Sequence, residues 1–188
     1  GVSVVNALSK RLVVEVKRDG EIYTMEFSRG KTVKQIEVIG KTKTTGTKVT
    51  FWPDPEIFQE TTVYDHDTIS ARLQETAFLN RGLKIVFTDD RELTPRVEEY
   101  CYQGGINDFV KFLNEGNEIL PGLSKPIYVQ GKSADDVTDD KRGEVEVSIQ
   151  WNTGYGSKVM TFANNIYTID GGTHLEGFRT ALTRTIND

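Results

Sequence analysis

Cysteine is nearly absent from this chain, since it occurs once, at Cys101. A single thiol excludes an internal disulfide framework, and small secreted scaffolds that depend on disulfides are thereby excluded. One free cysteine fits a reducing compartment. We therefore expect a cytoplasmic protein.

Long apolar runs and an excess of positive charge are also missing. No window approaches the roughly 18 consecutive apolar residues of a membrane helix, and the first residues do not have the pattern of a signal peptide. The 23 Lys and Arg residues against 28 Asp and Glu residues leave a net charge of -5. No global basic field draws the chain to nucleic acid, so any DNA contact is local or made elsewhere.

What the chain does contain is enough apolar material for a core. Hydrophobic residues make up 37% of its 188 residues. This length suits one large domain or two small ones. The pattern of strands and helices predicts an α+β fold.

Alternating apolar residues predict strands in the first part of the chain. Residues 12–16 and 22–27 flank Asp19-Gly20, a pair that suits a type I′ turn, so we expect a hairpin there. Further strands are expected at residues 33–39 and 47–52. From Asp67 the period changes to that of a helix, which we expect to close at Gly82 with a left-handed cap.

The second part of the chain repeats the mixture of elements. Strands are expected at residues 83–87 and 98–103, and a helix follows Gly104-Gly105, so we place the domain boundary between residues 102 and 103. Residues 145–151 alternate strictly, which predicts a strand with one buried face, and residues 160–163 are expected to be its partner.

The last helix is expected to begin with a capping box. Thr173 and Glu176 have the required spacing, with Gly171-Gly172 as a backbone turn before them. The apolar stripe expected to be buried on this helix consists of Leu175, Phe178, Leu182 and Ile186.

Recognisable catalytic motifs are missing from the sequence. It has no phosphate loop, no nucleophile elbow and no metal-ligand spacing. Its two histidines, His66 and His174, are better explained as capping or surface residues than as ligands. The acidic group Asp135, Asp136, Asp139 and Asp140 lacks the offsets of a calcium loop, so we expect a solvated connection there.

Both ends of the chain interrupt helical patterns. Residues 1–9 carry helical spacing with no capping residue before them, and residues 180–188 have no glycine stop. We expect the chain to be a piece of a longer protein. The alternative, an intact small protein with a processed first residue, stays open at this point.

Four segments together resemble one known family. They are residues 1–9 (GVSVVNALS), 45–53 (TGTKVTFWP), 78–83 (FLNRGL) and 164–179 (NNIYTIDGGTHLEGFR). This set resembles the B subunit of bacterial DNA gyrase, the ATPase subunit of a type IIA topoisomerase. The resemblance implies a two-layer α/β sandwich. Residues 1–102 would form the C-terminal part of a GHKL-type ATPase domain, and residues 103–188 a truncated, ribosomal S5-like transducer domain.

The same resemblance implies an ATP site. Gly1 and Val2 match the end of the glycine-rich lid over the phosphates, Thr47 matches the threonine that helps to hold adenine, and Val49 matches an apolar residue of the adenine pocket. Arg18 matches the arginine that contacts aminocoumarin inhibitors. ATP and Mg²⁺ are the implied cofactors.

Several family residues have no counterpart in this chain. The glutamate base, the magnesium-binding asparagine and the aspartate that reads adenine would precede Gly1, and the lysine that reaches the γ-phosphate would follow Asp188. The 188-residue chain alone is therefore expected to be inactive, and its Mg²⁺ ligand would lie outside it.

The resemblance also implies the activity and partners of the parent protein. That protein would supercoil DNA negatively with ATP, would act on duplex DNA together with gyrase A, the DNA-cleaving partner, and would dimerise with ATP. It would not involve a membrane. The ATPase subunit of topoisomerase IV is the enzymatic alternative, and a non-catalytic dimerisation or interaction module is the alternative for the isolated chain.

Overall fold

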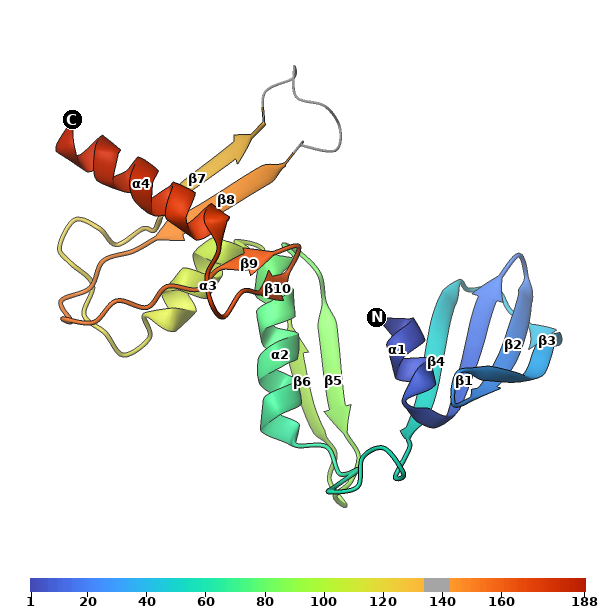
Figure 1. Cartoon of the computed structure of the whole chain (residues 1–188). Helices are drawn as coiled ribbons and strands as arrows, with labels where there is room; N and C mark the ends of the chain where they lie inside the picture. Colours follow the sequence, from blue (N-terminus) through green and yellow to red (C-terminus); the bar gives the residue numbers. More distant parts are fainter. Residues whose placement is uncertain (134–142) are drawn as a thin grey trace. The chain divides into compact units, whose positions relative to one another are not determined.

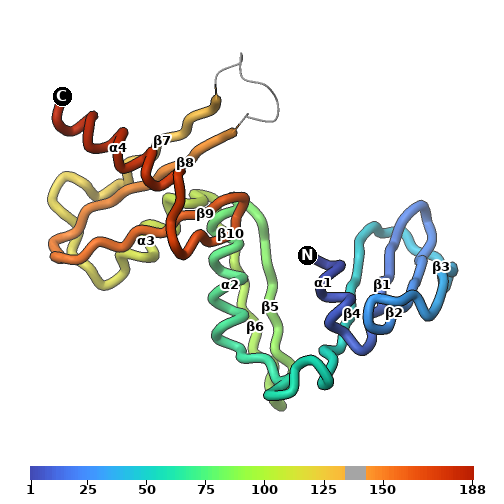
Figure 2. Tube along the Cα trace, in the orientation of Figure 1, coloured from blue at the N-terminus to red at the C-terminus, as the bar shows by residue number. Residues whose placement is uncertain are grey.

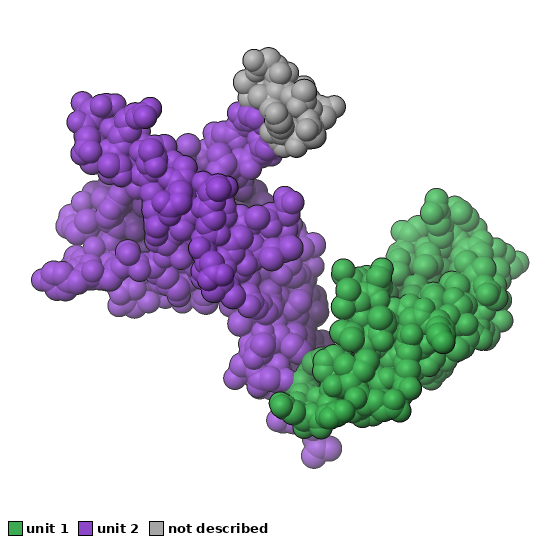
Figure 3. All heavy atoms as spheres, in the orientation of Figure 1, with its two compact units in different colours: residues 1–64 green, residues 65–188 purple. Residues whose placement is uncertain are grey.

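The structure, a computed structural model, describes residues 1–133 and 143–188. The expected acidic connection at Asp135, Asp136, Asp139 and Asp140 lies outside the described residues. The chain divides into two compact units, residues 1–64 and residues 65–188 (Figure 3). Helices and mainly antiparallel hairpins occur in separate stretches of the chain, which is an α+β arrangement.

The first unit is one antiparallel sheet with a short helix. The helix α1 (Val2–Ala7) precedes β1 (Ser9–Arg18), β2 (Glu21–Ser28), β3 (Lys31–Lys41) and β4 (Gly46–Pro53). The strand order is β3-β2-β1-β4, so β1 lies between β2 and β4 (Figure 1). The expected strands are confirmed.

Two tight turns set the hairpins of this sheet. Asp19 and Gly20 have φ values of 54° and 82°, and Arg29 and Gly30 have φ values of 49° and 80°. Two successive left-handed residues are what a type I′ turn requires, and this turn matches the twist of the strands it joins. The hairpin predicted at Asp19-Gly20 is thereby confirmed.

The register of the sheet separates apolar from polar side chains. In the β1–β4 pairing, Leu12 lies opposite Phe51, and Glu15 lies opposite Lys48. Glu15 and Lys48 form an ion pair at 3.3 Å on one face. Because successive side chains of a strand point to opposite faces, the apolar residues gather on the other face. We call this the apolar face; its residues include Leu12, Val14, Val16, Met25, Phe27, Val49 and Phe51.

The second unit begins with a helix and a hairpin that pack together. Its elements are α2 (His66–Leu79), β5 (Ile85–Asp89), β6 (Arg96–Tyr100) and α3 (Ile106–Leu113). Strands β5 and β6 are antiparallel, and α2 contacts both strands and α3.

The rest of this unit consists of two hairpins and a helix. Strands β7 (Ile127–Lys132) and β8 (Glu144–Ile149) pair with each other, as do β9 (Phe162–Ala163) and β10 (Ile166–Tyr167). The helix α4 (Thr173–Asn187) follows. The β9–β10 hairpin lies beside the C-terminal end of α2 (Figure 2), where the Asn165 amide donates a hydrogen bond of 3.0 Å to Asn80.

Stacked aromatic rings form the core of the second unit. Phe78 of α2 is 2% exposed, and its ring stacks on Tyr102 at 3.6 Å and on Phe109 of α3 at 4.7 Å between centroids. Phe109 in turn contacts Phe162 of β9. These rings connect α2, α3 and the β9–β10 hairpin.

The predicted partner of the 145–151 strand is wrong. Strand β8 pairs with β7, not with residues 160–163, and Val129 lies opposite Val147. Residues 162–163 instead pair with residues 166–167, because Asn164 and Asn165 both adopt positive φ and close a tight turn between them. The predicted buried face of β8 is wrong as well, since Val145 is exposed.

Three expectations about helices also need correction. The helix α2 ends at Leu79, and Gly82, although left-handed, lies in the following turn, where its N–H donates to the Tyr102 carbonyl. The helix α4 begins at Thr173 itself, with Gly172 as N-cap and no side-chain capping bond, so the capping box is wrong. No residue of α4 is buried, and Ile186 at the end of its apolar stripe is exposed.

Removal of the central ring tests this description of the core. We expect Phe78→Ala to destabilise the second unit by about 3–5 kcal/mol, because a buried aromatic side chain leaves a cavity. Urea unfolding followed by Trp151 fluorescence in a Trp52→Phe background measures this loss. Leu93→Ala, at a fully exposed position, is the matched control and should change stability by less than about 0.5 kcal/mol. Equal effects of the two substitutions would contradict the assigned core.

Candidate functional site

Thr47 and Val49 lie on the apolar face of the first unit. They are two residues apart on β4, so their side chains share one face of the strand. Thr47 lies opposite Val16 and Val49 opposite Val14. Both residues are exposed, and Val49 keeps 39% of its surface accessible. This part of the sheet therefore presents aliphatic surface with a hydroxyl group beside it.

The helix α1 packs against the other end of the same face. Val5 and Leu8, in and just after α1, share a cavity of about 190 Å³ with Phe51 and Pro53 of β4. Since Phe51 follows Val49 by two residues, α1 lies over the face that carries Thr47 and Val49.

Gly1 and Val2 lie at the N-terminal end of α1. Gly1 is the N-cap, and its carbonyl accepts hydrogen bonds from the Val4 and Val5 amides at 3.0 Å and 3.3 Å. Val2 is 61% exposed. Gly1 and Val2 therefore belong to the helix that packs on the apolar face, and both residues are exposed to solvent.

Arg18 lies at the end of β1 where the strand enters the Asp19-Gly20 turn. Its guanidinium is 3.5 Å from the Asp19 carboxylate, and both side chains are largely exposed. Arg18 follows Val16 by two residues, so it belongs to the same face as Val16 and its partner Thr47. The structure therefore brings Arg18, Thr47 and Val49 to one face of the sheet.

This arrangement suits a flat, partly polar ligand. Ligand sites in proteins are mainly apolar with a few placed polar groups. The apolar face supplies the aliphatic surface, Thr47 supplies a hydroxyl that donates or accepts, and Arg18 supplies a positive charge at the rim. Among the described residues no group of three His, Cys, Asp or Glu side chains is placed to hold a metal ion.

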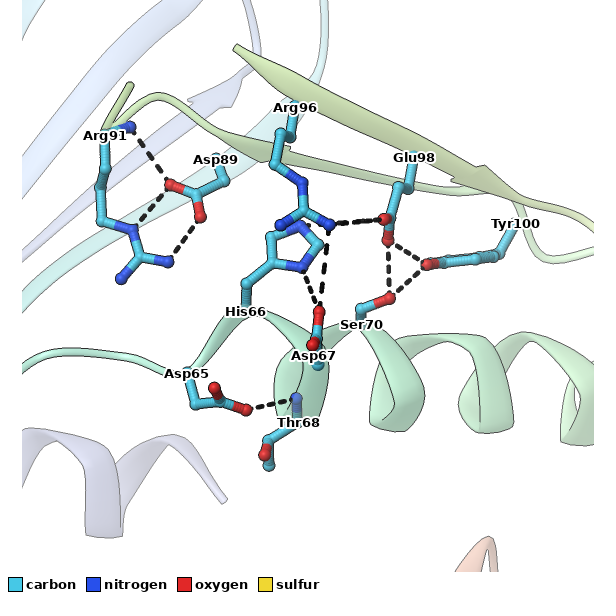
Figure 4. Close-up of polar contacts among 10 residues, drawn as sticks. All are labelled: Asp65, His66, Asp67, Thr68, Ser70, Asp89, Arg91, Arg96, Glu98 and Tyr100. Atoms are coloured by element: carbon cyan, nitrogen blue, oxygen red, sulfur yellow. Dashed lines mark hydrogen bonds and ion pairs between the residues drawn. The ribbon is translucent and has the colours of Figure 1, made fainter.

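A separate polar cluster connects α2 to β6 in the second unit (Figure 4). Ser70 donates a hydrogen bond of 2.6 Å to the Glu98 carboxylate, Tyr100 donates to the same carboxylate oxygen, and the Ser70 and Tyr100 hydroxyls are 2.6 Å apart. These hydrogen bonds lower the pKa of Glu98. No motif in the sequence indicates this cluster.

His66 is buried beside this cluster, so the surface alternative is wrong for this residue; it is the first residue of α2, and the N-cap is its neighbour Asp65. The residue is 7% exposed, its Nδ1 is 3.2 Å from Asp67, and its Nε2 is 3.8 Å from Glu98. Its ring packs on Phe87 of β5. The Ser70 hydroxyl contacts Glu98 and Tyr100, so it joins α2 to β6 by hydrogen bonds. A nucleophilic serine would instead need a base beside its hydroxyl. His174 is exposed, as expected, with Nε2 3.2 Å from the Thr168 hydroxyl.

No described helix combines the length and apolar composition needed to cross a bilayer.

Comparison with known proteins places this fold in a family. Residues 105–188 match the family model for DNA gyrase B. The chain is 50% identical over 188 residues to the DNA gyrase B subunit of Streptococcus pneumoniae serotype 4 and 49% identical to that of Clostridium acetobutylicum. Each alignment covers 100% of this chain and 28% of the relative.

A solved structure gives the same result. The crystal structure of the 43K ATPase domain of Thermus thermophilus gyrase B in complex with an aminocoumarin matches with a TM-score of 0.83 and 42% identity. The match covers 98% of this chain and 48% of that chain.

The fold is therefore that of a GHKL-type gyrase ATPase segment of the α+β class. The chain belongs to the DNA gyrase B family, and the matched names favour gyrase over topoisomerase IV. It spans 28% of the length of the two relatives.

The Asp89–Arg91 pair, also drawn in Figure 4, generates a prediction about pH. Arg91 donates two hydrogen bonds to the Asp89 carboxylate, from Nε at 2.8 Å and Nη2 at 2.6 Å, and these lower the pKa of Asp89 to about 2. A lowered carboxyl pKa contributes stability above the ordinary value of 3.8, and this contribution is lost as the pH falls through about 2.

We expect Asp89→Asn to flatten the loss of stability of the second unit between about pH 4 and about pH 2. Urea midpoints measured by Trp151 fluorescence across that range give the slope for the variant and the parent chain. Arg91→Gln should flatten the same window, since it removes the other partner. An unchanged slope in both variants would contradict the assignment.

Proposed function

We propose that this chain forms part of the ATP-binding subunit of DNA gyrase, a type II topoisomerase that introduces negative supercoils into DNA with ATP. The observation that carries the proposal is the 50% identity with a DNA gyrase B subunit along all 188 residues. The apolar face supports it from a second direction, because its residues suit an adenine ring.

The proposed site uses the residues that the structure leaves accessible. Val49 and Val2 would line the adenine pocket, and Thr47 would hold the adenine ring by a hydrogen bond. Gly1 would contribute to the lid over the phosphates, where the N-terminal end of a helix favours negative charge. The Mg²⁺ that accompanies ATP would take its ligand from outside this chain.

Arg18 would contact aminocoumarin inhibitors. The matching Thermus thermophilus domain was solved with such a compound. The position of Arg18 supports this role, because its exposed guanidinium lies on the same face as Thr47, at the turn that ends β1.

Residues 1–102 would belong to the ATPase domain and residues 103–188 to the transducer domain. The match to the DNA gyrase B family model begins at residue 105, close to this boundary. The division into two compact units instead falls between Tyr64 and Asp65 in the sequence. Under this proposal α2, β5 and β6 belong to the ATPase domain in sequence, and α2 packs with α3 of the transducer domain.

The parent protein would act in the cytoplasm on duplex DNA with gyrase A, and ATP would dimerise it. A plasmid assay tests this function. The full-length protein that contains this chain, assembled with its gyrase A partner, is expected to supercoil relaxed plasmid only when ATP is present. Decatenation without supercoiling would assign it to topoisomerase IV, and no ATP-dependent change by folded protein would contradict both assignments.

Substitution of Thr47 tests the site itself. In the full-length subunit we expect Thr47→Val to raise the KM for ATP about two- to tenfold, because a hydrogen bond to the ligand is worth about 0.5–1.5 kcal/mol. Thr50→Val is the matched control on the same strand, since Thr50 lies opposite Val13 on the other face. ATP hydrolysis rates at varied ATP concentration give both values. An equal KM for the two variants would remove Thr47 from the site.

A further inference from the structure

The helix α1 is only partly covered by the sheet. The helix has 6 residues and none of them is buried. Val5 and Asn6 are half-buried, and the segment that joins α1 to β1, namely Leu8 and Ser9, adds contacts that set the direction of the helix.

Two other parts of the sheet hold this junction by backbone hydrogen bonds. The Arg29 amide, in the turn between β2 and β3, donates to the Ser9 carbonyl at 2.9 Å, and the Asp54 amide, just after β4, donates to the Leu8 carbonyl at 3.0 Å. The Ser9 hydroxyl donates to the Val5 carbonyl inside α1 at 2.6 Å. Ser9 is fully buried, so the junction is the rigid end of the helix.

The two residues that hold the junction are bound to each other. Arg29 Nε is 2.5 Å from Asp54 Oδ2, and Arg29 Nη2 donates to Asp54 Oδ1 at 3.3 Å. Asp54 is 1% exposed, and its carboxylate also accepts a hydrogen bond of 3.0 Å from the Glu56 amide. The Glu56 amide and Arg29 together lower the pKa of Asp54. A buried carboxylate with these partners is strongly held, because an uncompensated buried charge is costly.

The backbone of Arg29 shows why this contact matters. Arg29 adopts a left-handed φ of 49°, which costs energy for any residue other than glycine. The ion pair with Asp54 stabilises this turn and connects it to the end of β4. The next residue, Gly30, lies against α1, since a Cβ atom there would be 3.6 Å from Ala7 Cα. The turn therefore touches both the junction and the helix.

We propose that Arg29 and Asp54 are a positioning pair, which holds the junction at Leu8-Ser9 and thereby directs α1, with Gly1 and Val2 at its N-terminal end, toward the nucleotide. This inference rests on the proposed function for its effect on ATP. Arg29 and Asp54 do not contact the nucleotide in this proposal. They act on nucleotide binding through the position of α1.

The test uses two readouts that do not depend on each other. Hydrogen exchange of the 188-residue chain measures the protection of the Val4, Val5 and Leu8 amides, which are bonded within α1. Binding of a non-hydrolysable ATP analogue to the full-length subunit measures affinity. We expect Arg29→Met to speed exchange of these amides about tenfold and to weaken binding of the analogue about tenfold, because the variant removes the charge-assisted hydrogen bonds to Asp54.

Conservative and control variants separate positioning from general loss of stability. Arg29→Lys keeps the charge and should restore most of the affinity that Arg29→Met loses. Glu26→Gln breaks the Arg11–Glu26 pair, which joins β1 and β2 of the same sheet at 2.6 Å, and should leave both readouts unchanged. Asp54→Asn should act like Arg29→Met.

The outcomes are distinct. Faster exchange confined to α1 together with weaker binding supports the proposal. Uniformly faster exchange across the sheet would mean a general structural role and would overturn it, as would unchanged exchange in α1. If the unaltered full-length subunit does not bind the analogue, the proposed function fails, while the exchange data still decide whether the pair positions α1.

Discussion

The antiparallel register of β1 against β2 and β4 is the constraint on which the rest of the first unit depends. This register places Val16 opposite Thr47 on the apolar face, and it places Glu15 opposite Lys48 on the other face of the sheet. A slip of one residue would move every side chain of a strand to the other face. Thr47 and Val49 would then both leave the face that carries the candidate site. The site therefore depends on the strand pairing as well as on the residue types.

Local patterns in the sequence predict the local parts of the fold well. Asp19-Gly20 defines its own turn, because two left-handed residues in succession suit one hairpin geometry. Local patterns do not predict the partner of β8. That partner is β7, which is separated from β8 in the sequence by a segment that includes residues 134–142. Both β7 and residues 160–163 contain apolar residues, and the alternation of apolar and polar residues in β8 does not show which of the two segments pairs with it. The turn at Asn164-Asn165 is a signal in the sequence that would have favoured the right pairing.

The candidate site follows the same division. The spacing of Thr47 and Val49 places them on one face without any structure, whereas their proposed roles come from the family resemblance. The cluster of Ser70, Glu98 and Tyr100 was missed because Ser70 and Glu98 are 28 residues apart and neither residue type is unusual where it stands. Arg29 and Asp54 are 25 residues apart, and only the folded sheet brings them together.

The edge strand β3 has a consequence for handling the protein. It is 11 residues long, and Val33, Ile36 and Val38 are at least half exposed along it. Edges of this kind tend to add strands from other molecules, and charged residues oppose such aggregation. Lys34 lies within the strand, and Lys31 and Lys41 are its end residues, so their charges oppose such pairing along the edge. Salt screens these charges, so raising the salt concentration should favour association of separate copies along this edge.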